Sequence, residues 1–502
     1  APLVMARLDG EAEDSVLPIV IHFDEHSTFT RACVNAEVSD GDTLFKRMLY
    51  SIGSHLMCGG SLPNSPLKKL HREGRYFVVP VATSTSYEDV SFQMSKYVLT
   101  PIPLPPLDTS NSQLLITNLL KKSDSDSDLI TSILSDEYFK MALSETGGFP
   151  GYIEYLFDTA LDEECRDLSK YLDRLESEIS GYFGQMAIDK PTWEHTVRLW
   201  ITHSTVSRET ELVAKDGATV KLGQFLDAGF LHLSVTSQSR TSGPLHITPC
   251  LLKSAISNDV FSPTALPPVS KETPWSWHLF EEFYSYYMAS LVAAFKALPS
   301  FNGDLKLSHI LRGALPSGSP TLDLVVDRTK ISIKPTHIET DSEFCFKKGK
   351  SSGPFNQQLI ESNNFLKYVH LTKPSSPLVD SYLAVTLVGG SKVLILFQSK
   401  HTVNIGESTI QYSSMKETYD KLKKRIKDYV IGDMSVILVY ITNRTVSHVP
   451  ESVPDNLLWI SHDQLPLHLG SLAGRGLHIK EDQRLSSEDE DEEEEECDIA
   501  DE

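Results

Sequence analysis

The sequence predicts an α/β protein built from several domains. Its 502 residues are too many for one ordinary hydrophobic core. Short β-branched runs, such as residues 16–23 (VLPIVIHF) and 435–443 (SVILVYITN), have the composition of buried strands. Apolar residues recur with helical periodicity between such runs, mainly over residues 112–185. A content of 40% apolar and 23% charged residues is typical of a globular protein.

Composition excludes several classes of protein. No window of about 18 apolar residues is present, so we expect no membrane partner. The amino-terminal residues have neither a basic segment nor an apolar core, so they are not a secretion signal. They also lack an initiating Met, which leaves open a segment upstream. The six cysteines are scattered singly, which predicts neither a zinc site nor a disulfide framework and favours a reducing compartment.

The acidic charge is concentrated at one end of the chain. Residues 488–502 contain 12 acids and no base, and without them 56 acids stand against 46 bases, a charge of −10 instead of −22. We expect residues 481–502 to form a disordered acidic tail. The tail either keeps the protein in solution, binds a basic host or chromatin protein, or mimics a nucleic acid. The remaining acidity does not exclude a local basic channel for DNA.

The first predicted domain covers residues 1–185. The strand over 16–23 ends in Asp24 and Glu25, and a second strand covers 76–86. Residues 99–108 (LTPIPLPPLD) form a connector that cannot be helix interior. In residues 144–157 (SETGGFPGYIEYLF), a Gly-Gly-x-Pro turn predicts the start of a new helix.

Residues 186–262 form the second predicted unit. Two strand-like pieces flank a helix-like run, LGQFLDAGF. This pattern suits either a plain α+β linker or a small winged-helix module.

The third predicted domain covers residues 273–480. A helix over 273–298 presents one apolar face, and strands are predicted at 321–335, in the hairpin 376–400 and at 435–443. A helix over 413–430 lies between the last two. The predicted order is helix, strand, strand, strand, helix, strand.

The hairpin of residues 376–400 carries polar residues that a buried hairpin does not need. Strand side chains alternate between faces, so Gln398 and Lys400 share one face. A three-residue loop of Gly389, Gly390 and Ser391 would place Asp380 opposite Lys400 on that face. A two-residue Gly-Gly loop would move Lys400 to the other face.

An Asp oxygen, a Gln oxygen and a Lys suit metal-assisted hydrolysis of a phosphodiester. Mg²⁺ or Mn²⁺ prefers hard oxygen ligands such as Asp380 and Gln398. Lys400 would orient or deprotonate a water and neutralise developing charge. A buried Asp–Lys pair with Gln398 hydrogen-bonded beside it accounts for the same residues without a site.

A metal site would usually have another carboxylate. The helix over 273–298 offers Glu281 and Glu282, although either also suits a solvated surface. Asp323 and Asp327 compete with Asp380, but neither has a Q-x-K partner after a hairpin, so we rank them lower.

The stretch SPLVDSYLAV…ILFQSK resembles the core of the PD-(D/E)xK nucleases. In that family an Asp and a (Glu/Gln)-x-Lys lie on adjacent strands, and a Glu often comes from the first helix. The resemblance gives Asp380, Gln398 and Lys400 the metal-binding and catalytic roles, with Glu281 or Glu282 as a fourth residue. Gln398 replaces the commoner Glu and removes one negative charge.

Residues 16–25 resemble a Walker B strand, in which Asp24 would hold Mg²⁺ and Glu25 would activate a water. Residues 78–86 resemble the sensor strand that follows it, and GGFPG the start of a sensor helix. No G-x-x-x-x-G-K-[S/T] loop is present, and Gly151 stands where related ATPases tend to have Arg. The resemblance implies a truncated P-loop NTPase-like domain without ATP hydrolysis.

The three regions in this order resemble the Crinkler and retrotransposon hot spot superfamily. That resemblance implies an effector that acts on DNA in the nucleus, of a host cell if it is secreted, through a restriction-endonuclease-like carboxyl-terminal domain. Two alternatives stay open: an inactive DNA- or protein-binding effector, and a nucleotide switch that binds ATP through a phosphate loop upstream. Two sets of basic residues either contact DNA or form a solvated surface: Lys347, Lys348 and Lys350 in an insertion, and Lys421, Lys423, Lys424, Arg425 and Lys427 on the helix.

Overall fold

The computed structural model describes most of the chain after residue 105 and two strands before it. The described residues are 17–23, 76–82, 106–107, 109–122, 127–161, 168–183, 189–227, 231–234, 242–257, 277–298, 301, 303–335, 337–342, 364–372, 378–401, 409–426 and 434–477. The chain divides into two compact units, one of Ala1–Ile102 with Gly223–Leu231 and one of Pro103–Leu222 with His232–Glu502. The predicted boundaries at residues 185 and 262 stay predictions.

The first unit contains a pair of parallel strands, β1 (Leu17–Phe23) and β2 (Tyr76–Ala82). Both are apolar and rich in β-branched residues, as buried parallel strands are. Both were predicted as strands, and the structure confirms them. The short helix α10 (Gly223–Asp227) belongs to the same unit.

The second unit begins with a group of helices, as the periodicity over residues 112–185 predicts. They are α4 (Thr109–Lys122), α5 (Ser127–Ser135), α6 (Glu137–Glu145), α7 (Pro150–Leu161) and α8 (Leu168–Phe183). Between α6 and α7 the chain turns through Gly147 and Gly148, whose φ angles are 58° and 79°. A Cβ atom at Gly148 would lie 1.9 Å from the carbonyl oxygen of Leu107, so only glycine fits. The predicted Gly-Gly-x-Pro turn is confirmed.

A small α+β region follows the helices. It consists of α9 (Lys190–Ile201), β3 (Thr205–Ser207), β4 (Glu211–Val213), β5 (Thr219–Lys221), β6 (His232–Leu233), β7 (Ser242–His246) and α11 (Pro249–Ser257). Strands β3, β7 and β6 form one small sheet, and β4 and β5 form a hairpin. This arrangement fits an α+β linker, and the winged-helix alternative stays a prediction.

The centre of the second unit is a mixed six-stranded sheet. Its spatial order is β10 (Ile338–Ser342), β11 (Val369–Thr372), β12 (Ser381–Thr386), β13 (Lys392–Ser399), β15 (Met434–Ile441) and β17 (Leu457–Ile460). Strand β12 is antiparallel to both β11 and β13, whereas β13, β15 and β17 run parallel to one another. An α/β protein with a mixed sheet is therefore confirmed.

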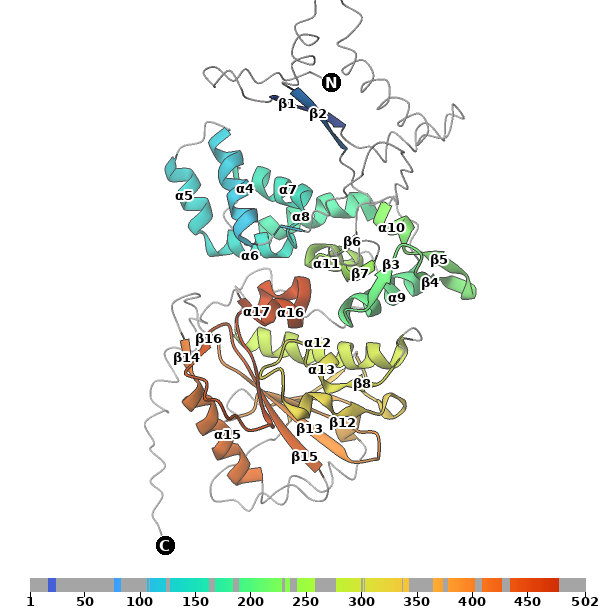
Figure 1. Ribbon diagram of the computed structural model, residues 1–502, viewed down its shortest axis with the longest axis vertical. Helices are drawn as coiled ribbons and strands as arrows, with labels where there is room; N and C mark the ends of the chain where they lie inside the picture. The colour runs from blue at the N-terminus through green and yellow to red at the C-terminus, as the bar shows by residue number, and fades with distance from the viewer. Residues whose placement is uncertain are drawn as a thin grey trace, which may run out of the picture. The chain divides into compact units, whose positions relative to one another are not determined.

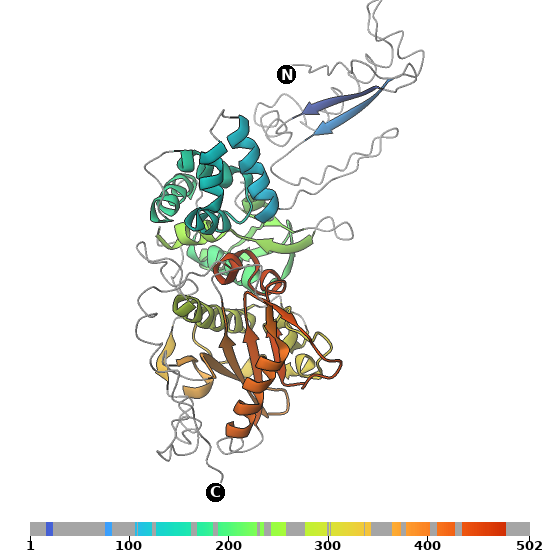
Figure 2. The ribbon, with the colours of Figure 1, turned by 90° about the vertical axis from the view of Figure 1, so that its left-hand side faces the viewer.

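Two long helices pack on opposite faces of this sheet. Tyr284 of α12 (Trp277–Ala297) contacts Phe397, with ring centroids 5.2 Å apart. Met415 of α15 (Tyr412–Ile426) joins a buried cluster with Leu396, whose side chain points to the other face. Figures 1 and 2 show both helices beside the strands. None of the described helices is long and apolar enough to cross a membrane.

The prediction of a strand over residues 321–335 is wrong. That segment forms two 3-10 turns, Pro320–Asp323 and Arg328–Lys330, around the two-residue strand β9 (Val325–Val326), which pairs with β8 (Leu305–Lys306). The hydroxyl of Ser319 and the carboxylate of Asp327 accept hydrogen bonds from nearby backbone N–H groups, which favours turns over a strand. Strands β10 and β11 take the predicted place in the sheet.

The remaining elements lie around this sheet. They are α13 (Leu307–Ile310), β14 (Thr409–Gln411), β16 (Thr445–Ser447), α16 (Leu465–Leu469) and α17 (Gly474–Leu477). The helix predicted over 413–430 is confirmed as far as Ile426, and residues 427–433 lie outside the described part.

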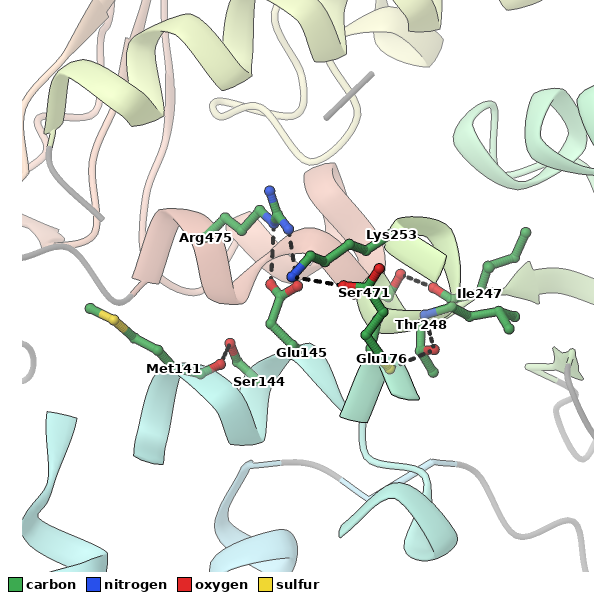
Figure 3. A network of polar contacts seen from close by, with 11 residues as sticks. Met141, Ser144, Glu145, Glu176, Ile247, Thr248, Lys253, Ser471 and Arg475 are labelled. Carbon is green, nitrogen blue, oxygen red and sulfur yellow. Dashed lines mark hydrogen bonds and ion pairs between the residues drawn. The ribbon is translucent and has the colours of Figure 1, made fainter. Parts of the chain in front are cut away.

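A buried ion pair joins α6 to α17. Arg475 donates from Nε and Nη2 to the two carboxylate oxygens of Glu145, at 3.1 and 3.0 Å. Both side chains are almost fully buried, at 6% and 1% exposure. Figure 3 shows the pair with a second contact nearby, in which the Ser471 hydroxyl donates to the carbonyl of Ile247. The ion pair thus links helix α6 to helix α17, which follows the last strand of the six-stranded sheet.

Candidate active site

Strand directions bring the predicted polar residues to one edge of the sheet. Because β13, β15 and β17 are parallel, their carboxyl ends lie at the same edge. Asp380 immediately precedes β12, which runs the opposite way, so it lies at that edge too. Open α/β sheets commonly bind ligands outside the carboxyl ends of their parallel strands.

The register of the hairpin differs from the predicted one by two residues. Thr386 pairs with Lys392, and the loop consists of Val388, Gly389 and Gly390. Asp380 therefore lies opposite Gln398 and not opposite Lys400, which corrects the predicted pairing. The shift is even, so the faces do not change, and Asp380, Gln398 and Lys400 still share one face. Gly389 and Gly390 have φ angles of 103° and 94°, which explains why glycines form this loop.

Hydrogen bonds fix Asp380 in place. Its backbone N–H donates to the carbonyl of Phe397 at 2.9 Å, and its carbonyl accepts from the Thr372 N–H at 2.8 Å. The Nε2 atom of Gln398 lies 3.1 Å from each carboxylate oxygen. The backbone N–H of Ser399 donates to Oδ2. The carboxylate is therefore held by donors from β13.

Of the two candidate glutamates, the structure brings Glu281 to the site. Glu281 is 8% exposed and hydrogen-bonds Asp380 from the first turns of α12. Glu282 is half-buried, and its charge acts on Tyr286, one turn further along the same helix. Adjacent helical positions point about 100° apart, so packing of the helix selects one of the two.

Lys400 completes the group from the end of β13. Its backbone N–H donates to the carbonyl of Ile441 at 2.8 Å, which extends the ladder to β15 by one residue. Its side chain is exposed, and its positive charge acts on both Glu281 and Asp380. The structure thus brings four of the predicted residues together: Glu281, Asp380, Gln398 and Lys400.

The two carboxyls form a coupled pair. Burial raises the pKa of Glu281, the charge of Asp380 raises it further, and Lys400 opposes both effects. Burial also raises the pKa of Asp380, but the Ser399 N–H, Lys400 and Gln398 act to lower it. Each carboxyl thus influences the ionisation of the other, and the two titrate as a pair.

The donor set fits a hard divalent cation. The Oε1 atom of Gln398 is buried and has no hydrogen-bond partner among the described residues, while the Nε2 atom of the same amide faces the carboxylate of Asp380. Carboxylate and amide oxygens are the ligands that Mg²⁺ prefers. The described residues contain no group of three or more His, Cys, Asp or Glu side chains that could hold a metal, and Gln398 would offer an amide oxygen in addition to the two carboxyls.

The other predicted site residues lie elsewhere or outside the described part. Asp24 and Glu25 follow β1 but are not among the described residues. Asp323 pairs with Lys306 at 2.8 Å, and Asp327 caps its own 3-10 turn. Both aspartates are thus engaged in local structure, and the backbone N–H of Asp327 donates to the carbonyl of Thr386 near the loop of the hairpin, at the opposite end of β12 from Asp380.

Two further residues at the same edge were not predicted from the sequence. His401 follows Lys400, and its ring lies 4.4 Å from that of Phe280, the neighbour of Glu281. Arg444 follows β15 by three residues, and its charge acts on both His401 and Tyr440. Their positions just after predicted strands, in QSKH and YITNR, are the signal that would have identified them.

Comparison of the chain with protein-family models, with curated proteins and with solved structures finds no match.

Proposed function

We propose that the chain is a Crinkler-type protein that hydrolyses DNA at a divalent-metal site of the PD-(D/E)xK type. The observation that carries this proposal is the convergence of Glu281, Asp380, Gln398 and Lys400 at one edge of the mixed sheet. The same proposal assigns a restriction-endonuclease-like fold to the carboxyl-terminal domain. A helix before the sheet and an antiparallel hairpin that carries the polar residues support that assignment.

For the amino-terminal region the proposal is a truncated P-loop NTPase-like domain. The parallel pairing of β1 with β2 supports it, because the Walker B-like strand and the sensor-like strand would then be neighbours. ATP would bind only with a phosphate loop upstream of residue 1. We also propose the nucleus as the site of action, and residues 481–502 as a contact for basic host or chromatin proteins.

Each residue of the site has a role that follows from its surroundings. Glu281, Asp380 and the Gln398 Oε1 atom would hold the cation, which would stabilise negative charge that develops on the phosphate. Asp380 is oriented by the N–H groups of Gln398 and Ser399. Lys400, exposed at the strand end, would orient or deprotonate the attacking water and neutralise charge on the phosphoryl oxygens.

One observation favours a second candidate function, a non-catalytic binding protein. The Gln398 amide nitrogen engages both oxygens of Asp380, which leaves the carboxylate fully hydrogen-bonded without a cation. A glutamate at this position would repel Asp380 and favour a cation between them. The brace and the metal site thus use the same residues, with the Gln398 Nε2 atom engaged in the brace and the Oε1 atom assigned to the metal.

Metal binding separates the two functions. We expect calorimetric titration with Mn²⁺ to show binding by the native protein, and binding at least about tenfold weaker in Asp380→Ala and Glu281→Ala. Glu282→Ala is the matched control, because it removes an adjacent acid of the same helix, and it should bind as the native protein does. No Mn²⁺ binding by the native protein, or equal binding by all four proteins, would favour the non-catalytic function.

A further inference from the structure

Arg444 lies at the edge of the sheet where the candidate site is formed. It follows the carboxyl end of β15, the strand beside β13, and Lys400 donates its backbone N–H to Ile441 of the same strand. The Thr442 hydroxyl accepts from the backbone N–H of Arg444 at 3.1 Å, and the Arg444 carbonyl accepts from the His462 N–H at 3.1 Å. Hydrogen bonds therefore hold both the backbone N–H and the backbone carbonyl of Arg444.

Two neighbours of Arg444 lie at the same edge of the sheet. Arg444 acts electrostatically on Tyr440, which also senses the charge of Asp380 and pairs in register with Gln398. It acts likewise on His401, whose ring lies against Phe280 next to Glu281. Arg444 thus lies at the β15 side of this sheet edge, and Lys400, whose charge acts on both carboxyls, lies at the β13 side.

The guanidinium lacks a protein anion in the part of the chain that the structure describes. Its Nε atom is buried without a hydrogen-bond partner, and no described carboxylate forms an ion pair with it. The contrast with Arg475 is direct, because that buried arginine is held by both oxygens of Glu145. A half-buried arginine without a carboxylate is stabilised when an anion that matches its planar donors binds.

We propose that Arg444 binds a phosphate group of the DNA backbone next to the phosphodiester that the site cleaves. This inference rests on the proposed function for the identity of the ligand. The ring of His401, on which the charge of Arg444 acts, lies 4.4 Å from the ring of Phe280 on α12. Arg444 is therefore a substrate-positioning residue, distinct from the four residues that would hold the metal and the water.

The test is the binding of a fluorescent 20-base-pair DNA duplex, measured by anisotropy in EDTA over a range of KCl concentrations. We expect Arg444→Gln to bind about tenfold more weakly than the native protein, with a salt slope smaller by about one. Arg444→Lys keeps the positive charge but loses the planar N–H donors of the guanidinium. Its affinity for the duplex should lie between those of the native protein and Arg444→Gln. The matched control is Arg198→Gln, which removes the same charge from a half-buried arginine on α9, paired with Glu194 at 3.1 Å.

Equal affinity and salt slope in Arg444→Gln and Arg198→Gln would overturn the inference. Thermal unfolding of each variant, together with the intermediate behaviour of Arg444→Lys, separates loss of a contact from loss of fold. Mn²⁺ titration of the same proteins keeps the two proposals apart. A native protein that fails to bind Mn²⁺ but shows the Arg444 effect would contradict metal-dependent cleavage and support the phosphate contact.

Discussion

The side-chain nitrogen of Gln398 lies 3.1 Å from both carboxylate oxygens of Asp380. The two residues face each other across adjacent antiparallel strands, one residue beyond the pair Ser381 and Phe397. The amide oxygen of Gln398 is buried and has no hydrogen-bond partner in the part of the chain that the structure describes. Rotation of the amide by half a turn would present that oxygen where the nitrogen now lies, so a cation and the hydrogen bond compete for one position.

Gln398→Glu should raise the affinity for metal and lower the stability of the metal-free protein. A third carboxylate would strengthen Mn²⁺ binding by about tenfold, since affinity for a hard cation rises with ligand charge. Without metal, the variant loses the donor to Asp380 and adds repulsion, which we expect to cost about 1–3 kcal/mol of unfolding free energy. Calorimetry and urea unfolding in EDTA measure the two effects. Gln398→Ala is the control, and it should lose stability without gaining affinity.

The buried ion pair of Glu145 and Arg475 should be sensitive to the removal of one partner. Glu145→Gln leaves an uncompensated guanidinium with 6% exposure, which we expect to cost about 3–5 kcal/mol. The double change Glu145→Gln and Arg475→Met should cost less than the single one. Glu137→Gln, which breaks a pair on the surface of the same helix, is the control and should change the urea midpoint little. An equal effect of both single changes would contradict this account.

His468 should make the protein less stable in acid. Its ring nitrogens contact the Tyr284 hydroxyl at 2.9 Å and the Arg312 carbonyl at 3.1 Å, which suits a neutral imidazole. Burial lowers its pKa from 6.5 to about 3. The unfolded chain therefore binds more protons below pH 6.5, and stability falls as the pH falls from 6.5 towards 3, by up to about 1.4 kcal/mol per pH unit.

Urea midpoints between pH 7.5 and 4.5 measure this dependence. We expect His468→Gln to flatten the curve, since it removes one proton taken up on unfolding. The exposed His448 provides the comparison, and His448→Gln should leave the curve as it is. A curve of unchanged steepness in His468→Gln would show that another group causes the acid sensitivity.

The lysines of α15 should contribute to DNA binding if the helix contacts the backbone. Lys421, Lys423 and Lys424 are all exposed, and Lys421 forms an ion pair with Glu417 of its own helix. Their joint replacement by Gln should lower the salt slope by up to about three and weaken binding accordingly. Replacement of the exposed Lys215, Lys221 and Lys330 changes the net charge equally and serves as the control. Equal slopes in the two triple variants would show that α15 is a solvated surface.

The polar residues of the hairpin were predictable because strand alternation depends only on parity. The observed loop begins one residue earlier than the predicted one, at Val388 instead of Gly389. This shift changes the partner of Asp380 from Lys400 to Gln398 but keeps all three residues on one face. The choice between Glu281 and Glu282 was not predictable, since it depends on how α12 packs on the sheet. The segment 321–335 looked like a strand by composition, yet local caps at Ser319 and Asp327 convert it into turns.

Arg444 was missed for a different reason. Its sequence neighbourhood is an ordinary strand end, and only the parallel pairing of β13 with β15 brings it to Lys400. Long-range pairing of this kind leaves no local pattern in the sequence.

The most direct test of the central claim is the nicking of supercoiled plasmid DNA in Mg²⁺ or Mn²⁺ by the native protein, Asp380→Ala and Lys400→Ala. We expect the native protein to convert the plasmid to open circles and both variants to lose at least about a hundredfold in rate. EDTA should abolish the native activity. Equal nicking by all three preparations, or none by the native protein, would contradict the assignment of a metal-dependent nuclease.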